Sequence, residues 1–238
     1  MIAILTSDID DLKATLKTMI PIDETDQVES TPVFISHMCK DSIIFANMSW
    51  QKVEIAKTIA DLNAHCDLTA VIGASTTASL ISDEARIGTL GICSNAIQYD
   101  IDFSSLGYPI GNINLLNTVI LKSSHNLLRF ADIASKKCGF CAACGRFVSA
   151  DRFVASQEDS DCLKCKYNCQ FIDSTAAPLL TTCRFYHIPG IVISGITDYA
   201  DDDAVEDYNH NRDAAAIASL ETAITLADIL SNKYKLHK

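Results

Sequence analysis

The sequence predicts an α/β fold of three layers, in which helices cover both faces of a central mixed, mainly parallel β-sheet. Apolar runs of strand length alternate along the chain with segments whose apolar residues recur at a spacing of about 3.6 residues. This alternation is typical of parallel strands that are connected by helices. The chain has 238 residues, 48% of them hydrophobic, which is enough for one substantial core. The sequence shows no linker, internal repeat or low-complexity tract, so we expect a single domain over residues 1–238.

The first predicted elements alternate between strand and helix patterns. Residues 2–5 form an apolar run that predicts a buried strand, and residues 10–19 have the pattern of an amphipathic helix. Residues 33–36 and 42–46 are short apolar runs that predict two further strands. In residues 52–63 the apolar side chains again recur at about 3.6-residue spacing, which predicts a helix.

The middle of the chain continues this alternation. Residues 68–72 are mostly apolar and end at a glycine, as expected of a buried strand that runs into a loop. Residues 87–93 and 99–103 predict two more strands. Residues 127–137 predict a helix, and residues 146–149 predict the strand that follows it.

The last part of the chain predicts two helices around a buried strand. Residues 176–186 have a helical pattern, in which Pro178 is tolerated because it falls in the first turn. Residues 189–196 are rich in β-branched residues and predict a strand, which is followed by a polar loop at residues 197–203. The alanine-rich residues 213–230 predict the final helix.

Charge and hydropathy exclude several classes of partner. The formal net charge is −11, and an acidic surface repels phosphate groups, so we expect neither nucleic acid nor an anionic membrane as a partner. We find no apolar run of the roughly 20 residues that a membrane-spanning helix needs. Residues 1–8 lack the basic start and long apolar stretch of a signal peptide. We therefore expect a cytoplasmic protein.

Polar residues follow three of the predicted strands, at residues 73–76, 149–153 and 197–201. In open sheets with parallel strands, ligands bind beyond the carboxyl ends of the strands. We therefore expect these three segments to lie near one pocket.

Several stretches together resemble one protein family. They are residues 86–90, 99–102, 106–111, 148–154 and 188–201. In composition, order and spacing they are similar to stretches of the 5'-methylthioadenosine/S-adenosylhomocysteine nucleosidases, within the nucleoside phosphorylase superfamily. The resemblance covers nearly the whole chain. It implies a hydrolase that splits the N-glycosidic bond of adenine nucleosides, with a purine nucleoside or adenine as its small-molecule partner and no cofactor.

The resemblance also implies roles for individual residues. Asp198 stands where the family has the aspartate that protonates or hydrogen-bonds N7 of the purine, and Asp11 where a glutamate helps to orient the attacking water. A proton on N7 lets adenine leave as a neutral molecule, while the C1' carbon becomes cationic and is captured by water. From the residues alone, an aspartate in the place of Asp198 is usually a cap or a solvated charge. Asp11 is equally well explained as an acidic residue that is favourable near a helix N-terminus.

Further residues are implied to contact the substrate. Phe153 stands where the family stacks an aromatic ring on the base, and Val154 where main-chain groups contact the adenine edge. Ser75 matches a serine near the ribose and the attacking water, and Thr197 precedes Asp198 in the same segment. We expect Trp50 to fill part of the pocket for the 5' substituent.

The sequence departs from the family pattern at the ribose. The family carries a glutamate that binds the 2'- and 3'-hydroxyls, and this chain has Thr175 there, preceded by Asp173 and Ser174. A neutral hydroxyl forgoes a charge-assisted hydrogen bond, typically worth about 1.5–3 kcal/mol, and a negative charge that would stabilise a cationic sugar. An alternative is therefore a non-catalytic or substrate-shifted purine-binding relative. A phosphorylase is the third reading. Such an enzyme needs cationic residues around a phosphate, and only Arg86 and Arg152 lie near the matched loops.

Six of the ten cysteines lie in two short stretches. They are Cys138, Cys141 and Cys144, followed by Cys162, Cys165 and Cys169. Paired cysteines at this spacing are known from zinc and iron–sulfur sites. Buried thiols without a metal are the preferred reading, because cysteine is often fully buried, and a disulfide is a further alternative.

The resemblance finally implies a homodimer. Residues 106–111 and the following Leu115 and Leu116 resemble the family's loop that reaches the pocket of the neighbouring subunit.

Overall fold

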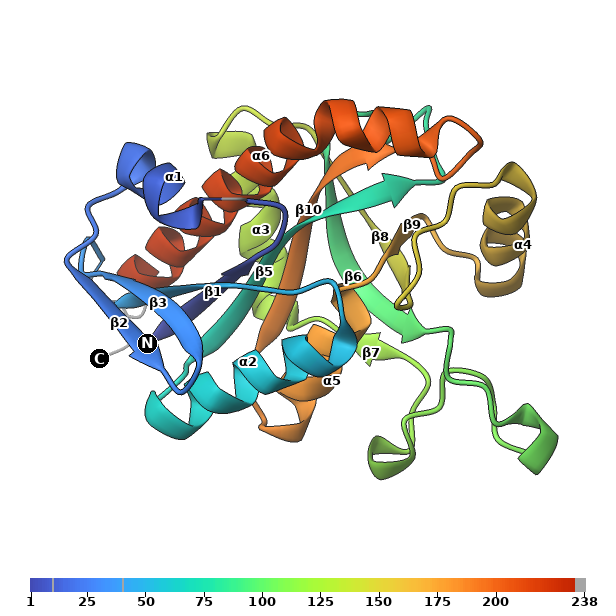
Figure 1. The fold of residues 1–238 in the computed structure, drawn as a ribbon, viewed down its shortest axis with the longest axis horizontal. Coiled ribbons are helices and arrows are strands. Elements are labelled where there is room, and N and C mark those ends of the chain that lie inside the picture. Colours follow the sequence, from blue (N-terminus) through green and yellow to red (C-terminus); the bar gives the residue numbers. More distant parts are fainter. Residues whose placement is uncertain (10, 40, 234–238) are drawn as a thin grey trace.

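A computed structural model describes residues 1–9, 11–39 and 41–233 of the chain. Strands and helices alternate along it and build the α/β architecture shown in Figure 1. The strands are β1 (Ile2–Thr6), β2 (Glu24–Val28), β3 (Thr31–Ser36), β4 (Ile43–Asn47), β5 (Ala70–Ser79), β6 (Leu90–Gln98), β7 (Leu121–Lys122), β8 (Ala142–Ser149), β9 (Phe171–Asp173) and β10 (Gly190–Asp198). The helices are α1 (Leu12–Met19), α2 (Lys52–His65), α3 (His125–Lys137), α4 (Gln157–Tyr167), α5 (Ala176–Phe185) and α6 (Ala204–Lys233).

The strands that the structure describes form one mixed sheet. β1 pairs in parallel with β4 and β5, and β5 pairs in parallel with β10. β8 lies between β6 and β9, parallel to both, whereas β10 with β6 and β5 with β9 are antiparallel pairs. The strands β5, β10, β6, β8 and β9 therefore close into a ring of pairings. The antiparallel strands β2 and β3 extend the sheet beyond β4, and β7 pairs with β6.

Side chains of the sheet alternate between two hydrophobic cores, because successive residues of a strand point to opposite faces. Along β1, Ile2 and Ile4 belong to the core that also contains residues of α1, α3 and α6. Ala3 and Leu5 belong to the core that contains residues of α2 and α5. Figure 1 shows α3 and α6 on one side of the sheet and α2 and α5 on the other. The predicted α/β class and its three layers are confirmed.

Some element boundaries predicted from the sequence are wrong. Residues 99–103 do not form a strand, because the chain turns at Tyr99 and Asp100, directly after β6. The Ile101 N–H is hydrogen-bonded to the Gln98 carbonyl across this turn instead of to a neighbouring strand. The last helix begins at Ala204, whereas the sequence predicts its start at residue 213. The prediction is wrong because the first turns of the helix are polar and lack an apolar pattern. Residue 10, where the first helix was predicted to begin, lies outside the described residues.

Four elements have no counterpart in the prediction. β2 exposes nearly every residue, and α4 is polar along most of its length, so neither carries an apolar period. β7 and β9 have two and three residues, which is too short for a periodic pattern. All four are held by their neighbours in the fold and not by a local signal.

α6 is long and apolar enough to cross a membrane by length and composition alone. This differs from our expectation that the sequence has no such segment. However, 72% of its most apolar window is buried inside the fold, where the helix packs on β10, β5 and α3. α6 is therefore a core helix of this domain.

The packing of α6 on β10 requires a glycine at position 195. A Cβ atom on Gly195 would lie 2.2 Å from the Ala215 carbonyl oxygen, which is far closer than such atoms approach in proteins. We predict that Gly195→Ala lowers the free energy of unfolding by about 3 kcal/mol or more, since backbone of α6 must move. Urea unfolding measures this change.

A matched control is Gly107→Ala. Gly107 has φ of 86° but open space around its Cβ position, so only backbone strain of about 1–2 kcal/mol is expected. Equal losses for the two variants would contradict the close-approach explanation.

Candidate functional site

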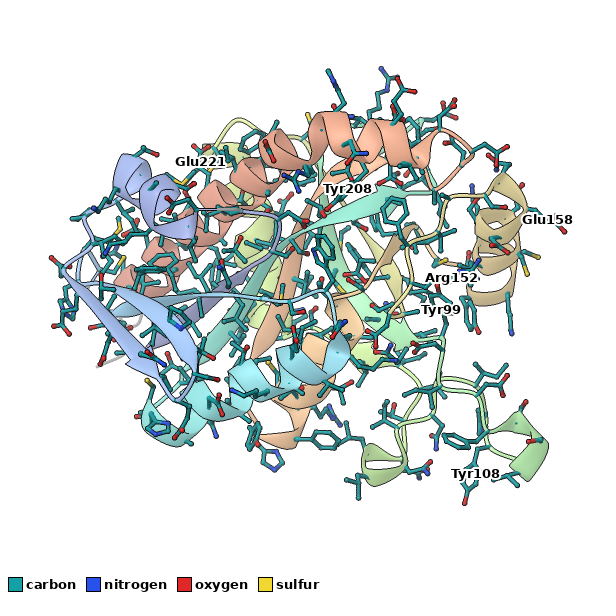
Figure 2. All side chains as sticks on the ribbon, viewed as in Figure 1. Tyr99, Tyr108, Arg152, Glu158, Tyr208 and Glu221 are labelled. Atoms are coloured by element: carbon teal, nitrogen blue, oxygen red, sulfur yellow. The ribbon has the colours of Figure 1, made fainter. Side chains whose placement is uncertain are left out.

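A cavity of about 480 Å³ opens at the ends of several strands of the closed ring. Side chains from the ends of β5, β9 and β10 line it, together with the segment after β8 and the first turns of α6. The lining residues are Trp50, Gln51, Thr76, Thr77, Ala78, Asp151, Arg152, Phe153, Val154, Ile172, Asp173, Ser174, Thr197, Asp198, Val205, Tyr208 and Asn209. Two of them are labelled in Figure 2, which shows Tyr208 at the start of α6 and Arg152 beside α4.

The cavity brings together most of the site residues that the sequence predicts. Trp50, Phe153, Val154, Asp173, Ser174, Thr197 and Asp198 all line it. The structure keeps three others out of the lining, namely Asp11, Ser75 and Thr175. The three segments expected to meet at one pocket do so, although Ser75 itself points elsewhere.

Asp198 is a buried carboxyl group at the end of β10, with only 2% of its surface exposed. Its Oδ2 accepts a hydrogen bond from the Thr197 hydroxyl at 2.8 Å, and its Oδ1 accepts one from the Ala200 N–H at 2.9 Å. Burial raises the pKa of Asp198, and these two hydrogen bonds oppose the rise. The negative charges of Asp207 and Asp201 raise this pKa further. Asp198 is thus a group that holds a proton to higher pH than an ordinary aspartate, at the wall of the cavity.

Phe153 and Val154 form the wall that follows β8. Val154 is buried, whereas 51% of Phe153 is exposed, so part of its ring is accessible for contact. The rings of Phe153 and Tyr208 are in edge-to-face contact, with 5.3 Å between the ring centroids and 71° between the ring planes. An aromatic face beside a buried acid is suited to a planar, nitrogen-containing ring.

Ion pairs and main-chain bonds hold this wall in place. The Lys52 N–H, at the start of α2, donates to Asp151 Oδ1 at 3.0 Å. The Arg152 guanidinium pairs with Asp159 of α4. The segment after β8 is therefore fixed between α2 and α4.

Asp173 caps helix α5 as well as lining the cavity. Its Oδ1 accepts from the Ser149 hydroxyl at 2.5 Å, and its Oδ2 accepts from the Ala176 N–H at 2.7 Å. The Thr175 hydroxyl donates to the same Oδ2 at 2.8 Å. Burial raises the pKa of Asp173, and these hydrogen bonds oppose the rise. The Asp173 carboxylate therefore uses its hydrogen bonds to hold the start of α5 in place.

Thr175 and Ser75 belong to a buried polar network beneath the cavity. Ser75 is fully buried, and its Oγ lies 3.1 Å from Thr175 Oγ1 and 2.8 Å from Ser194 Oγ. Thr175 is 2% exposed and is satisfied by Ser75 and Asp173. Neither hydroxyl is presented to the cavity, so this network positions strands β5 and β10 against the start of α5.

Asp11 lies on the surface and caps helix α1. Its Oδ1 accepts a hydrogen bond from the Ala14 N–H at 2.9 Å. The carboxylate is exposed and lies outside the cavity lining. This geometry matches the reading of Asp11 as an acidic residue that stabilises a helix N-terminus.

The sequence patterns do not identify Asp8 and Tyr208 as site residues. Asp8 lies two residues after the end of β1, and its carboxylate accepts hydrogen bonds from three side chains of the cavity wall. Asp8 could have been identified from the sequence as an acidic residue at the carboxyl end of a buried strand. Tyr208 was missed because the last helix was predicted to begin after it.

The two groups of cysteines do not build a metal site in the described part of the chain. All ten thiols are free, and residues 1–9, 11–39 and 41–233 contain no group of three or more His, Cys, Asp or Glu side chains placed to hold a metal ion. Cys138 packs toward α6, where its Sγ lies 3.2 Å from Thr225 Oγ1. Cys169 is buried, and burial raises its pKa to about 11. The prediction of buried thiols is wrong for the other five, because Cys138 is partly exposed and Cys141, Cys144, Cys162 and Cys165 are exposed. The second group lies on and after α4.

Comparison with known proteins agrees with this fold. A model of the phosphorylase superfamily matches residues 7–231. A 5'-methylthioadenosine/S-adenosylhomocysteine nucleosidase from Staphylococcus haemolyticus is 24% identical over 154 residues, which cover 64% of this chain and 67% of that protein.

Solved structures share the whole fold. Futalosine hydrolase of Helicobacter pylori superimposes with a TM-score of 0.87 at 21% identity, covering 95% of this chain and 97% of that chain. A 5'-methylthioadenosine/S-adenosylhomocysteine nucleosidase from Neisseria meningitidis, in complex with methylthio-immucillin-A, has a TM-score of 0.87 at 20% identity, covering 95% and 98%. At these identities the likeness establishes the fold. The family resemblance predicted from the sequence is confirmed.

The network around Thr175 predicts the outcome of placing a carboxylate there. A glutamate at position 175 would be buried against Asp173, so burial and the neighbouring charge would raise its pKa in the folded state above the usual value of about 4.3. The resulting penalty is absent where both groups are protonated and grows as the pH rises. We predict that Thr175→Glu lowers the free energy of unfolding by about 2–4 kcal/mol at about pH 7.5, and by less at about pH 5.

Urea unfolding at the two pH values measures the difference. Thr18→Glu, on the exposed side of α1, is the matched control and should show little pH dependence. A Thr175→Glu variant as stable as the wild type at both pH values would contradict the assignment of position 175 to a closed network.

Proposed function

We propose that this chain, which belongs to the phosphorylase superfamily, hydrolyses the N-glycosidic bond of adenine nucleosides. The observation that carries the proposal is the position of Asp198, a buried acid with a raised pKa on the wall of a cavity that is also lined by the half-exposed ring of Phe153. The curated relatives that are named as 5'-methylthioadenosine/S-adenosylhomocysteine nucleosidases support it.

The base occupies the part of the cavity between Phe153 and Asp198. The adenine ring stacks on the exposed face of Phe153, and main-chain groups around Val154 contact its edge. The Asp198 carboxyl donates its proton toward N7 as the bond from the base to C1' breaks, so adenine leaves without a net charge. The raised pKa of Asp198 increases the fraction of the protein in which this acid holds the proton that it donates.

The sugar then becomes cationic at C1' and is captured by water. Thr197 keeps the Asp198 carboxyl in place through its hydrogen bond to Oδ2. Asp11 and Ser75 have no part in the proposed step, because neither lines the cavity. No organic cofactor is needed for this reaction.

A purine-binding protein without catalysis is the second candidate. Thr175 favours it, because no carboxylate at that position balances a cationic sugar. A phosphorylase is less well supported. Arg152 is paired with Asp159, and Arg86 lies outside the cavity lining, so the described cavity lacks a cluster of cations for phosphate. For the hydrolase we expect a cytoplasmic location.

Asp198→Asn tests the proton transfer. An amide can occupy the same place, but it is a very poor proton donor, so we predict a fall in kcat of about 10²–10⁴-fold with adenosine or 5'-methylthioadenosine. Adenine affinity should fall far less, because the contacts with Phe153 and Val154 remain. Adenine release measures the rate, thermal melts check the fold, and Asp202→Asn on the same loop is the control. Equal rates in wild type and Asp198→Asn would remove this acid from the mechanism.

We further propose that the chain forms a homodimer through the segment between β6 and β7. This segment projects away from the body of the molecule (Figure 1) and exposes 71% of Leu106, 47% of Tyr108 and 88% of Leu115. Leu116 is partly buried against the core behind it. Apolar side chains gathered on one projection are typical of an association surface.

Light scattering at micromolar concentration should therefore give twice the chain mass of 25.9 kDa. Leu115→Glu should shift the protein toward the monomer, because a charge on the contact surface must be desolvated. Ile217→Glu, on the exposed side of α6, should not shift it. A wild-type protein of single-chain mass would contradict the dimer.

A further inference from the structure

Asp8 is the centre of a hydrogen-bond network at the cavity wall. Its Oδ1 accepts from the Trp50 indole N–H at 3.0 Å and from the Tyr208 hydroxyl at 2.5 Å. Its Oδ2 accepts from the hydroxyls of Ser7 and Thr76, each at 2.8 Å. Asp8 adopts φ of 64°, a left-handed conformation that is uncommon for a residue other than glycine. Such strain persists only where the surrounding contacts enforce it.

The network fixes which atoms the cavity wall can offer. A carboxylate has about four acceptor positions, and four donors already occupy those of Asp8. The protons of Thr76 and Tyr208 both point at Asp8, so the oxygens of these hydroxyls can only accept further hydrogen bonds. Both residues line the cavity. Asp8 therefore turns two hydroxyl groups that could donate into acceptors.

Tyr208 remains protonated in this role. Burial raises the pKa of Tyr208, and its hydrogen bond to Asp8 raises it further, while Arg212 lowers it. The Tyr208 hydroxyl donates its proton to Asp8, so its oxygen can still accept a hydrogen bond. The tyrosine thus offers the cavity an acceptor.

The location of these acceptors fits the sugar. The Tyr208 ring is in edge-to-face contact with the Phe153 ring, so the tyrosine lies beside the base position. Thr76 comes from β5, where it pairs with Gly195 of β10, the strand that carries Asp198. A group attached to the base between Phe153 and Asp198 would reach Thr76 and Tyr208. This placement rests on the function proposed above.

We propose that Asp8 fixes Thr76 Oγ1 and Tyr208 Oη as acceptors for hydroxyl groups of the sugar, so that the site selects hydroxylated nucleosides over 5'-thioethers. A hydroxyl has a proton to donate to such acceptors. A thioether sulfur has none and is a weak acceptor, so it leaves both oxygens without a partner. Sites built to hydrogen-bond a substrate hydroxyl discriminate strongly against the analogue that lacks it. Asp8 itself is a positioning residue, because its oxygens are already occupied.

Calorimetric titration tests the preference in the full chain carrying Asp198→Asn, which keeps the nucleosides intact. The ligands are adenosine, 5'-deoxyadenosine, 5'-methylthioadenosine, 2'-deoxyadenosine and adenine. We expect adenosine to bind about tenfold or more tightly than at least one analogue that lacks a hydroxyl, and more tightly than the thioether. The 5'-deoxy and 2'-deoxy ligands show which hydroxyl is bound. Equal or tighter binding of 5'-methylthioadenosine would overturn the proposal, as would failure of every nucleoside to bind.

Substitutions in the network separate recognition from structural support. Tyr208→Phe, Thr76→Val and Asp8→Asn should each reduce the ratio of adenosine to deoxy-analogue affinity to about threefold or less, while adenine binds within about twofold of its original affinity. Tyr186→Phe, outside the cavity, should leave the ratio unchanged. A uniform loss for all ligands, adenine included, would assign the network a structural role alone and overturn the proposal.

The result is distinguishable from a failure of the proposed hydrolysis. Binding in the expected order by a wild-type protein that releases no adenine would reject the hydrolase and keep this inference. Adenine release with a preference for thioethers would support the hydrolase and reject this inference.

Discussion

Strands β5 and β10 pair in parallel from Gly190 to Asp198, and this pairing places the end of β10 beside Thr76, Thr77 and Ala78. It also closes the ring of strands, because β10 pairs with β6 on its other side and β5 with β9. A closed ring brings strand ends that are distant in sequence to the border of one cavity. Gly195 of β10 in turn lets α6 approach the sheet and carry Tyr208 to the cavity wall. Fold and site therefore share one packing constraint.

Three carboxyl groups near the cavity illustrate how environment sets the task of an aspartate. Asp173 accepts three hydrogen bonds and holds the start of α5. Asp8 accepts four from neutral donors and orients side chains of the cavity wall. Asp198 accepts two, is buried, and has its pKa raised by that burial. Burial raises the pKa of Asp173 as well, but Asp198 accepts the fewest hydrogen bonds of the three and does not hold the start of a helix.

Much of the fold could be predicted from the sequence, because its buried strands and amphipathic helices carry strong apolar patterns. The strands that include Ile4, Ile72 and Ile193 are examples, since each is buried on both faces. Elements that are held by tertiary contacts could not be predicted in this way. Residues 99–103 have the composition of a strand, yet the chain turns at Tyr99 and Asp100, directly after β6. The polar α4 and the two-residue β7 likewise carry no local signal.

The residues of the candidate site also differ in whether they could be predicted from the sequence. Residues at strand ends, such as Asp198 and Phe153, could be placed from the pattern and the family resemblance, and both line the cavity. The direction of a buried hydroxyl could not be predicted in this way. The Ser75 hydroxyl is directed to Thr175 and Ser194 by contacts between residues that are distant in sequence. Asp8 gains its role only where residues about 40, 70 and 200 positions away in sequence converge on it. Such convergence is a property of the fold.

The most direct measurement is the release of adenine from adenosine by the wild-type protein in phosphate-free buffer, with both products identified by mass spectrometry. The account predicts free adenine and free ribose in equal amounts, at a rate that added phosphate does not change. Release that requires phosphate and yields a sugar phosphate would contradict hydrolysis, and the absence of release from any adenine nucleoside would contradict catalysis at this site.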